Sequence, residues 1–270
     1  MHRLTVSGID IAYLDEGNGP NVIVGHCSSA SHKEWLPLIA ELRPDWHVLA
    51  PDFIGYGQSQ TWPAGKPFSI DADVSILAKL AKKVRGPLHL VGHSYGAALA
   101  LEAARKLGPR VKSLTLVEPV TFHLLREGRA PARMARFEEL SIAVLTAVGK
   151  GDDRAAAAAF MSYWLGCWRW WLSPEKFKAA ITATIHKVAL EFTTAIDADE
   201  KLSAYAGVTA PTLLIAGSKT RAPARAVVDL LGATLPHAEL KIVKGAGHMS
   251  PFTHPAEINR LVRAHLDARR

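Results

Sequence analysis

Residues 88–101 form the segment that most restricts how this chain can fold. They read LHLVGHSYGAALAL: an apolar run, a serine two residues from a glycine on either side, then small and aliphatic residues at helical spacing. The apolar run predicts a buried strand, and the residues after it predict a helix. A sharp turn between them exposes the Ser94 side chain at the end of the strand, and Gly92 and Gly96 leave the room that such a turn needs.

Apolar runs typical of strands recur along the chain and alternate with helical stretches. This alternation predicts an α/β fold with a mostly parallel, eight-stranded sheet and helices on both faces. The first two runs are separated only by Ser7, Gly8 and Ile9 and predict a hairpin. The runs are RLTV, DIAYL, NVIVG, WHVLAP, LHLVG, SLTLVEP, TLLIAG and ELKIVKG, and the helical stretches lie around residues 31–42, 69–85, 95–107, 223–234 and 255–268.

One long segment interrupts the alternation. From 121 to 203 the sequence offers no convincing strand, and helical stretches rich in aromatic residues dominate, among them YWLGCWRWW. Strand signals resume at TLLIAG. We therefore expect a core domain made of residues 1–120 and 204–270 and a helical cap made of residues 121–203.

The composition is that of an ordinary globular protein. The chain has 270 residues, of which 49% are hydrophobic and 21% charged, and no stretch approaches the ~20 apolar residues of a membrane-spanning helix. The N-terminal segment lacks the apolar block of a secretory signal, and two cysteines are too few for a disulfide framework. We expect a cytoplasmic protein with no membrane partner.

The formal net charge is +7, and its distribution matters more than its sum. Most basic residues are scattered, and no stacking pattern or zinc-finger spacing accompanies them, so we expect no nucleic-acid partner. One patterned set has spacings of 3, 4 and 3 and predicts a helix face that is either simply solvated or a positive rim for anionic substrates. Its members are Arg126, Arg129, Arg133 and Arg136.

Three further segments make the chain resemble the α/β-hydrolase family over essentially its whole length. NVIVGHCSSA resembles the strand and oxyanion loop of that family, and PDFIGYGQS resembles the glycine-rich loop after the next strand. KGAGHMSPFTHP resembles the segment that carries the catalytic base. The resemblance implies that Ser94 lies in a nucleophile elbow and that residues 121–203 form a lid.

A serine hydroxyl is a poor nucleophile near neutral pH and needs an adjacent base that takes its proton. His248 is the candidate, because its glycine-flanked loop follows the last strand and lies at the same edge of the sheet as Ser94. The imidazole in turn needs a carboxylate that fixes its tautomer and stabilises its charged form.

The position of that carboxylate departs from the commonest family pattern. The acid usually follows the penultimate strand, where this chain has Thr220. Glu118 directly follows the preceding strand and keeps the order nucleophile, acid, base, so we assign it as the acid. A buried salt-bridge partner is the alternative interpretation of Glu118, and Asp197 and Asp199 remain weaker candidates.

The oxyanion of a tetrahedral intermediate needs donors, and we assign them to the backbone N–H groups of Ser28 and Tyr95. Cys27 replaces the usual glycine of the oxyanion loop, but a backbone N–H serves with any side chain. The aromatic segment above Ser94 predicts an apolar acyl or alcohol pocket as well as packing. We expect pocket walls or supporting groups at His26, Cys27, His93, Phe122, Trp164, Trp168 and Phe252.

These residues predict a serine hydrolase that acts on a carboxylic ester through an acyl-enzyme, with a small-molecule substrate and without a metal or organic cofactor. Epoxide hydrolases and haloalkane dehalogenases are disfavoured because they place Asp at the nucleophile position. A carbon–carbon bond hydrolase, lactonase, thioesterase or perhydrolase would use the same triad. A non-catalytic ligand-binding member of the fold also remains open, and the oligomeric state is not predicted.

Overall fold

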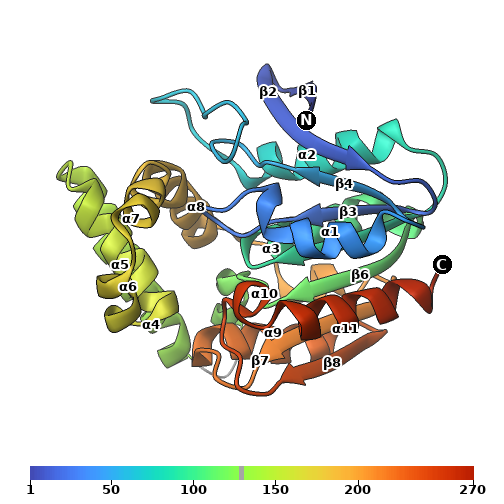
Figure 1. Cartoon of the computed structure of the whole chain (residues 1–270). Coiled ribbons are helices and arrows are strands. Elements are labelled where there is room, and N and C mark those ends of the chain that lie inside the picture. Colours follow the sequence, from blue (N-terminus) through green and yellow to red (C-terminus); the bar gives the residue numbers. More distant parts are fainter. Residues whose placement is uncertain (128–130) are drawn as a thin grey trace.

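The computed structural model describes residues 1–127 and 131–270, and an eight-stranded sheet forms its centre (Figure 1). The strand order is β1-β2-β4-β3-β5-β6-β7-β8; β1 and β2 form an antiparallel hairpin, β2 pairs antiparallel with β4, and all other pairs are parallel. The predicted hairpin and the α/β fold are therefore confirmed. The strands are β1 His2–Val6, β2 Ile9–Glu16, β3 Asn21–Gly25, β4 His47–Pro51, β5 Leu88–His93, β6 Val111–Val117, β7 Thr212–Gly217 and β8 Ala238–Val243.

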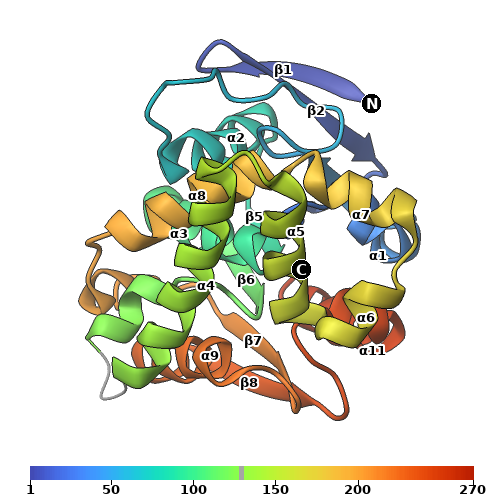
Figure 2. The same cartoon turned by 90° about the vertical axis from the view of Figure 1, so that its left-hand side faces the viewer.

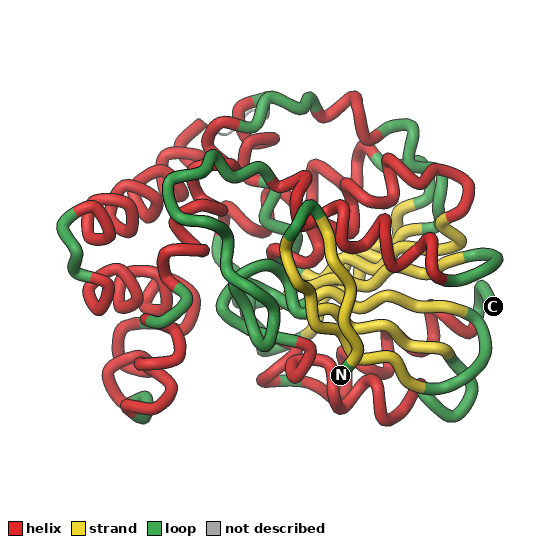
Figure 3. Tube along the Cα trace, turned by 90° about the horizontal axis from the view of Figure 1, so that it is seen from above, coloured by secondary structure: helices red, strands yellow, loops and turns green. Residues whose placement is uncertain are grey.

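Helices cover both faces of the sheet (Figure 3). One layer consists of α1 (Leu36–Leu42) and α11 (Pro255–Asp267), and the other contains α2 (Ile70–Lys83), α3 (Tyr95–Leu107) and α9 (Ala222–Thr234). The short helix α10 (Ser250–Thr253) precedes α11, and three-residue to five-residue turns of 3₁₀ helix add η1 (His32–Trp35), η2 (Gly108–Arg110), η3 (Phe122–Arg126) and η4 (Leu202–Tyr205). All five helical stretches expected from the sequence lie within a residue or two of these bounds.

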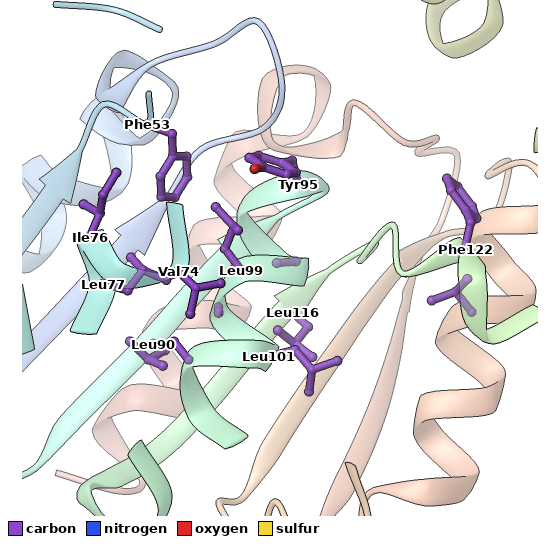
Figure 4. Close-up of a cluster of buried hydrophobic side chains, with 14 of the residues drawn as sticks. Phe53, Val74, Ile76, Leu77, Leu90, Tyr95, Leu99, Leu101, Leu116 and Phe122 are labelled. Atoms are coloured by element: carbon purple, nitrogen blue, oxygen red, sulfur yellow. The ribbon is translucent and has the colours of Figure 1, made fainter. Parts of the chain in front are cut away.

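Each face of the sheet has its own apolar core, because both faces of a parallel sheet are buried and its strands are apolar throughout. Figure 4 shows part of the larger core, where Leu90 and Leu116 of the sheet pack under α2 and α3. The opposite core packs Val22 and Val24 of β3 against Leu38 of α1 and Ile258 of α11. Strands β3–β8 run parallel between the two cores, so their carboxyl ends lie along one edge.

Further helices lie over that carboxyl edge (Figures 1 and 2). Within residues 121–127 and 131–203 the structure contains helices and no strand, as the sequence predicts. We call this segment the helical insertion; that it forms a separate cap domain remains a prediction. Among the described residues no helix is both long and apolar enough to span a membrane. The insertion includes α4 (Pro131–Gly149), α5 (Asp153–Leu165), α6 (Cys167–Leu172), α7 (Glu175–Thr182) and α8 (Ile185–Asp197).

Helix α3 begins unusually close to the strands that precede it. A Cβ atom on Gly96 would lie 2.4 Å from the carbonyl oxygen of Gly25 in β3, and a Cβ on Gly92 would lie 2.3 Å from the carbonyl oxygen of Gly96. Both distances are too short for any real side chain. The two glycines are therefore required by the contact between α3 and the sheet, and they place the first turn of α3 directly at the carboxyl edge.

We expect Gly96→Ala to destabilise the fold. The added Cβ must push α3 away from β3, and overpacking of this kind costs about 1–3 kcal/mol, which outweighs the better helix propensity of Ala. The melting temperature should fall by roughly 2–10 °C, measured by differential scanning calorimetry. Gly149→Ala is the matched control, because its Cβ meets nothing within 4 Å. An unchanged melting temperature for Gly96→Ala would contradict the close contact.

Candidate active site

Ser94 lies at the turn between β5 and α3, in a backbone conformation that side chains rarely adopt. Its φ and ψ are 54° and −114°, outside the helical and extended regions. A strained residue of this kind persists only where the surrounding structure fixes it. Here β5, α3 and the hydrogen bond from the Ser94 N–H to the Val117 carbonyl fix it, and the side chain is held at the carboxyl edge of the sheet.

His248 reaches Ser94 from the loop between β8 and α10. Its Nε2 lies 2.9 Å from Ser94 Oγ, and its ring stacks on the indole of Trp164 from α5 with the ring centroids 3.7 Å apart. Burial lowers the pKa of His248 below its ordinary value, although the Glu118 carboxylate acts in the opposite direction. The imidazole is therefore neutral at neutral pH and can accept a proton.

Glu118 follows β6 directly and holds the other side of the imidazole. Its Oε2 lies 2.8 Å from His248 Nδ1, and its Oε1 accepts a 2.8 Å hydrogen bond from the Gly217 N–H. The Thr220 hydroxyl also donates to Oε2, so the residue at the usual acid position supports the carboxylate that replaces it. Burial favours the neutral acid, but the hydrogen bonds and the charge of a protonated His248 hold the pKa of Glu118 below its ordinary value.

The three predicted triad residues thus form one line of hydrogen bonds. Both ring nitrogens of His248 are occupied, by Ser94 on one side and Glu118 on the other. Asp197, at the end of α8, is exposed, and its neighbour Asp199 is exposed as well, so neither weaker candidate occupies the acid position.

The oxyanion loop is held by carboxylates on both sides. The Cys27 N–H donates to Glu34 Oε2 at 2.8 Å, and the Ser28 hydroxyl donates to Glu191 Oε2 of α8 at 2.5 Å. Tyr95 is the first residue of α3, so its N–H has no acceptor one turn earlier in the helix. Ser28, Tyr95 and Ser94 border the same cavity, which is the arrangement that an oxyanion hole needs.

Two cavities meet at Ser94. The inner cavity runs under α4, α5 and α8, and Phe122, Phe137 and Phe192 line it. The outer cavity lies between the oxyanion loop and the His248 loop, and Cys27 and Phe252 line it. Trp164 and Phe160 border both. Cys27, Phe122, Trp164 and Phe252 are therefore found where the sequence analysis expects pocket walls.

The other three expected pocket residues line neither cavity. His26 is fully buried, accepts the Phe53 N–H at Nε2 and so donates from Nδ1 to the Cys27 carbonyl, which shapes the oxyanion loop. His93 is buried behind His248. Trp168 is 77% exposed on α6 and faces solvent. Its position could not be read from the sequence, because all five aromatic residues of that segment look alike there.

His93 forms a buried ion pair that the sequence analysis missed. Its Nδ1 lies 2.6 Å from Glu34 Oε1 and its Nε2 lies 2.9 Å from the His248 carbonyl, so both ring nitrogens face acceptors and both carry protons. Burial opposes the charge, but the Glu34 carboxylate raises the pKa of His93 above its ordinary value. This pair joins η1, the nucleophile turn and the His248 loop.

Cys27, Glu34 and His93 also form a group of potential metal ligands, with one ligand atom of each within 4.8 Å of the others. Glu34 and His93 already bind each other, and burial raises the pKa of the Cys27 thiol well above its ordinary value, which disfavours the thiolate. A metal ion would have to displace these bonds. The expectation that the protein uses no metal stays a prediction.

A second buried charge cluster joins α8 to the core. Lys187 Nζ lies 2.9 Å from Asp73 Oδ2 and 2.7 Å from Glu191 Oε1, and all three side chains are buried. The Tyr56 hydroxyl donates to Glu191 and the Tyr95 hydroxyl donates to Asp73. Lys187 and Glu191 are spaced four apart on one helix, a pattern that in a sequence looks like an exposed ion pair.

The expected arginine face does not form one helix surface. Arg126 ends η3 and donates to the carbonyl groups of Ile196 and Ala198, whereas Arg133 and Arg136 are exposed on α4. Arg129 lies outside the described residues. The prediction of a single helix face is wrong for Arg126, because Arg126 belongs to η3 whereas Arg133 and Arg136 belong to α4.

The strand order, the serine at the sharp turn and the helical insertion define the α/β-hydrolase class. The family model described as "alpha/beta hydrolase fold" matches residues 20–255, and the chain belongs to that family.

Individual relatives cover less of the chain. It is 36% identical over 104 residues to "Lipase LipV" of Mycobacterium tuberculosis, covering 38% of each chain. It is 30% identical over 168 residues to the "Putative 2-succinyl-6-hydroxy-2,4-cyclohexadiene-1-carboxylate synthase" of Bacillus subtilis, covering 60% of this chain and 57% of that one. The chain thus matches well under two thirds of the length of these relatives. A solved structure of a hydrolase from Pseudomonas aeruginosa PA01 matches with a TM-score of 0.78 and 26% identity, covering 98% of this chain and 97% of that chain.

We expect Glu34→Gln to change the His93 ring from charged to neutral at pH 6.5. In the native protein the carboxylate holds the pKa above 6.5, so the ring stays charged as the pH rises past that value and loses its proton only above the raised pKa. Without the charge of Glu34, burial dominates and the pKa falls below 6.5. Histidine ¹⁵N NMR across a pH titration measures both states, with exposed His237 as the internal reference. A ring of His93 that is neutral at pH 6.5 in the native protein would contradict the ion pair.

Proposed function

We propose that this protein is a serine hydrolase that cleaves a carboxylic ester through an acyl-enzyme, with Ser94 as nucleophile, His248 as base and Glu118 as acid. The observation that carries the proposal is the unbroken hydrogen-bond line from Ser94 Oγ through His248 to Glu118. The order of the three groups and their distances match what general-base activation of a serine requires.

In the first step Ser94 Oγ attacks the ester carbonyl while its proton passes to His248 Nε2. The imidazolium that forms is stabilised by Glu118, which accepts from Nδ1. The carbonyl oxygen becomes an oxyanion, and the N–H groups of Ser28 and Tyr95 donate to it. The strained Ser94 backbone supports this role, because it fixes the hydroxyl and the Tyr95 N–H in one rigid turn.

His248 then gives its proton to the leaving alcohol, and the acyl group stays on Ser94. The alcohol must lie next to His248 when this happens, and His248 lines the outer cavity but not the inner one. We therefore assign the outer cavity to the alcohol and the inner cavity to the acyl group. Water, activated by His248, enters through the vacated outer cavity and hydrolyses the acyl-enzyme.

The apolar lining of both cavities supports a substrate with an apolar acyl or alcohol part. Ester chemistry agrees with the name of the lipase relative, although the match covers only 38% of that protein. The name of the Bacillus subtilis relative points to a different reaction. The bond that is cleaved is therefore the first property to test.

Purified protein should react with a fluorophosphonate probe and hydrolyse p-nitrophenyl acetate. Ser94→Ala should abolish labelling and lower the hydrolysis rate by at least ~10⁴-fold, because the nucleophile is lost. Labelling is read by mass spectrometry and hydrolysis by absorbance. Protein that is folded but inert in both assays would instead favour a ligand-binding member of the fold. Labelling without hydrolysis of any open-chain ester would favour carbon–carbon, lactone, thioester or peracid chemistry.

Glu118→Gln should lower kcat on p-nitrophenyl acetate by about 10⁴-fold with KM little changed, because the imidazole loses the charge that stabilises its protonated form. Asp197→Asn is the matched control and should keep the native rate. Circular dichroism checks that both variants fold. A large loss in Asp197→Asn together with an active Glu118→Gln would overturn the assignment of the acid.

A further inference from the structure

The two residues assigned as oxyanion donors, Ser28 and Tyr95, also carry side-chain hydroxyls, and a carboxylate binds each hydroxyl. The Ser28 hydroxyl donates to Glu191 Oε2 at 2.5 Å. The Tyr95 hydroxyl donates to Asp73 Oδ2 at 2.7 Å. Glu191 lies on α8 of the helical insertion, and Asp73 lies on α2. Each half of the proposed oxyanion hole is therefore held from outside its own loop or helix.

Lys187 connects the two carboxylates. Its Nζ lies 2.7 Å from Glu191 Oε1 and 2.9 Å from Asp73 Oδ2, and all three side chains are buried. Buried charges attract one another more strongly than charges in water do, so the three groups hold one another in place. A continuous set of hydrogen bonds and ion pairs thus joins the side chains of the two oxyanion donors. We call it the oxyanion network, and its members are Ser28, Glu191, Lys187, Asp73 and Tyr95.

Each carboxylate of the network has a further donor from the loop after β4. The Tyr56 hydroxyl donates to Glu191 Oε1 at 2.7 Å, and the Ile54 N–H donates to Asp73 Oδ1 at 2.9 Å. All four carboxylate oxygens therefore accept at least one hydrogen bond. Neither carboxylate can turn without leaving a buried polar atom unsatisfied, which is costly.

Helix α8 contacts the oxyanion loop at a second point. The hydroxyl of Thr184, the residue before α8, lies 2.9 Å from Ser29 Oγ. Ser29 has a φ of 57°, in the left-handed region that residues other than glycine rarely adopt. Two consecutive residues of the loop, Ser28 and Ser29, are therefore bonded to α8 or to the residue that precedes it.

The positions of the two backbone donors decide how well an oxyanion is bound. An oxyanion hole is effective because its donors already lie about 2.7–3.1 Å from the site of the developing charge. Ser28 lies three residues beyond Gly25, the last residue of β3, so the close contact between β3 and α3 does not by itself fix the Ser28 N–H. Within residues 1–127 and 131–270 no acceptor binds this N–H, which leaves it for an oxyanion.

We infer that the oxyanion network sets the separation of the Ser28 and Tyr95 N–H groups, with Glu191 and Lys187 of α8 as positioning residues. The inference rests on the proposed function. It gives α8 a role in binding the transition state, in addition to its role as a wall of the inner cavity.

Ser28→Ala and Tyr95→Phe test the two ends of the network, because each removes one hydroxyl and keeps the backbone N–H. Each should lower kcat and kcat/KM on p-nitrophenyl acetate by about tenfold with KM little changed, because the oxyanion is held less well while the bound ester is not affected. Circular dichroism and the melting temperature check that both variants fold.

Each variant has a matched control. Ser31→Ala removes a hydroxyl from the same segment, where Ser31 accepts from the Lys33 N–H at the start of η1. Tyr205→Phe removes a buried tyrosine hydroxyl that also donates to a carboxylate, that of Glu102, outside the network. Both controls should keep the native kcat and KM.

Inhibition by ethyl trifluoromethyl ketone reports on the oxyanion hole directly. In its adduct Ser94 Oγ bonds to the carbonyl carbon, the Ser94 proton passes to His248 and the carbonyl oxygen becomes an oxyanion. The inhibition constant should rise in Ser28→Ala and in Tyr95→Phe by about the factor by which kcat/KM falls. A variant that merely unfolds more readily would lower the fraction of active enzyme and leave the inhibition constant unchanged.

The double variant Ser28→Ala/Tyr95→Phe shows whether the network acts as one unit. If it does, releasing either end already frees the donors, and the double variant should lose little more activity than the weaker of the two single variants. Independent effects would multiply to a loss of about a hundredfold. Full multiplication, or single variants with native kcat/KM and a native inhibition constant, would overturn the inference.

Glu191→Met tests the contribution of α8. It removes the acceptor of the Ser28 hydroxyl, while Lys187 keeps its partner Asp73 and is not left uncompensated. In the native background it should lower kcat/KM by about as much as Ser28→Ala does, and in the Ser28→Ala background it should have little further effect. A native kcat/KM in Glu191→Met would also contradict the inference.

The two proposals fail in different ways. If the proposed function is wrong, the native protein does not hydrolyse p-nitrophenyl acetate. If this inference is wrong, the native protein hydrolyses the ester and the network variants match it.

Discussion

The close contact between α3 and the strands β3 and β5 is the constraint on which the rest of the structure depends. Gly92 and Gly96 let the backbones of β3, β5 and α3 meet at distances that no side chain allows. That contact forces the backbone of Ser94 into its unusual conformation. The Tyr95 N–H then lies beside the Ser94 hydroxyl. Glu118 and His248 lie in loops that follow β6 and β8. Because the carboxyl ends of parallel strands lie at the same edge of the sheet, these loops reach the edge where Ser94 lies.

Buried charges hold the loops around that edge, and each has its partner. Glu34 binds both His93 and the Cys27 N–H, and Glu118 binds His248 and the Gly217 N–H. Breaking a buried pair by removing one partner leaves an uncompensated charge and destabilises strongly. An intact pair adds little net stability, because burying its two charges costs about as much free energy as their attraction returns. The main effect of these pairs is therefore to fix the positions of the loops. The candidate active site is rigid on its core side for this reason, before any substrate is bound.

Much of the fold could be predicted from the sequence, because the spacing of apolar residues within each segment indicates both its secondary structure and its buried face. The strands of the sheet and the helix after Ser94 each carry their own apolar pattern, and the order of Ser94, Glu118 and His248 follows from the strands that precede them. The buried partners could not be predicted. Glu34 lies on the four-residue η1 and Glu191 lies on α8, two helical segments where a charged residue is usually solvated, and only the tertiary fold shows what faces each of them. The exposure of Trp168 could not be predicted either, because an aromatic residue in a segment rich in aromatic residues is usually buried.

The cytoplasmic location and the absence of nucleic-acid and membrane partners remain predictions.

The helical insertion is attached to the core very unevenly. Helix α8 is bonded to the oxyanion loop by Glu191 and by the Thr184 hydroxyl at its start, and to α2 by Lys187. Trp168, Trp171 and Leu172 on α6, in contrast, face solvent. Swinging α8 outward would take Lys187 with it and leave the buried Asp73 carboxylate of α2 without its cation, whereas moving α6 and α7 breaks mostly surface contacts. We therefore expect any opening of the helical insertion to occur on the side where α6 and α7 lie, with α8 staying in place.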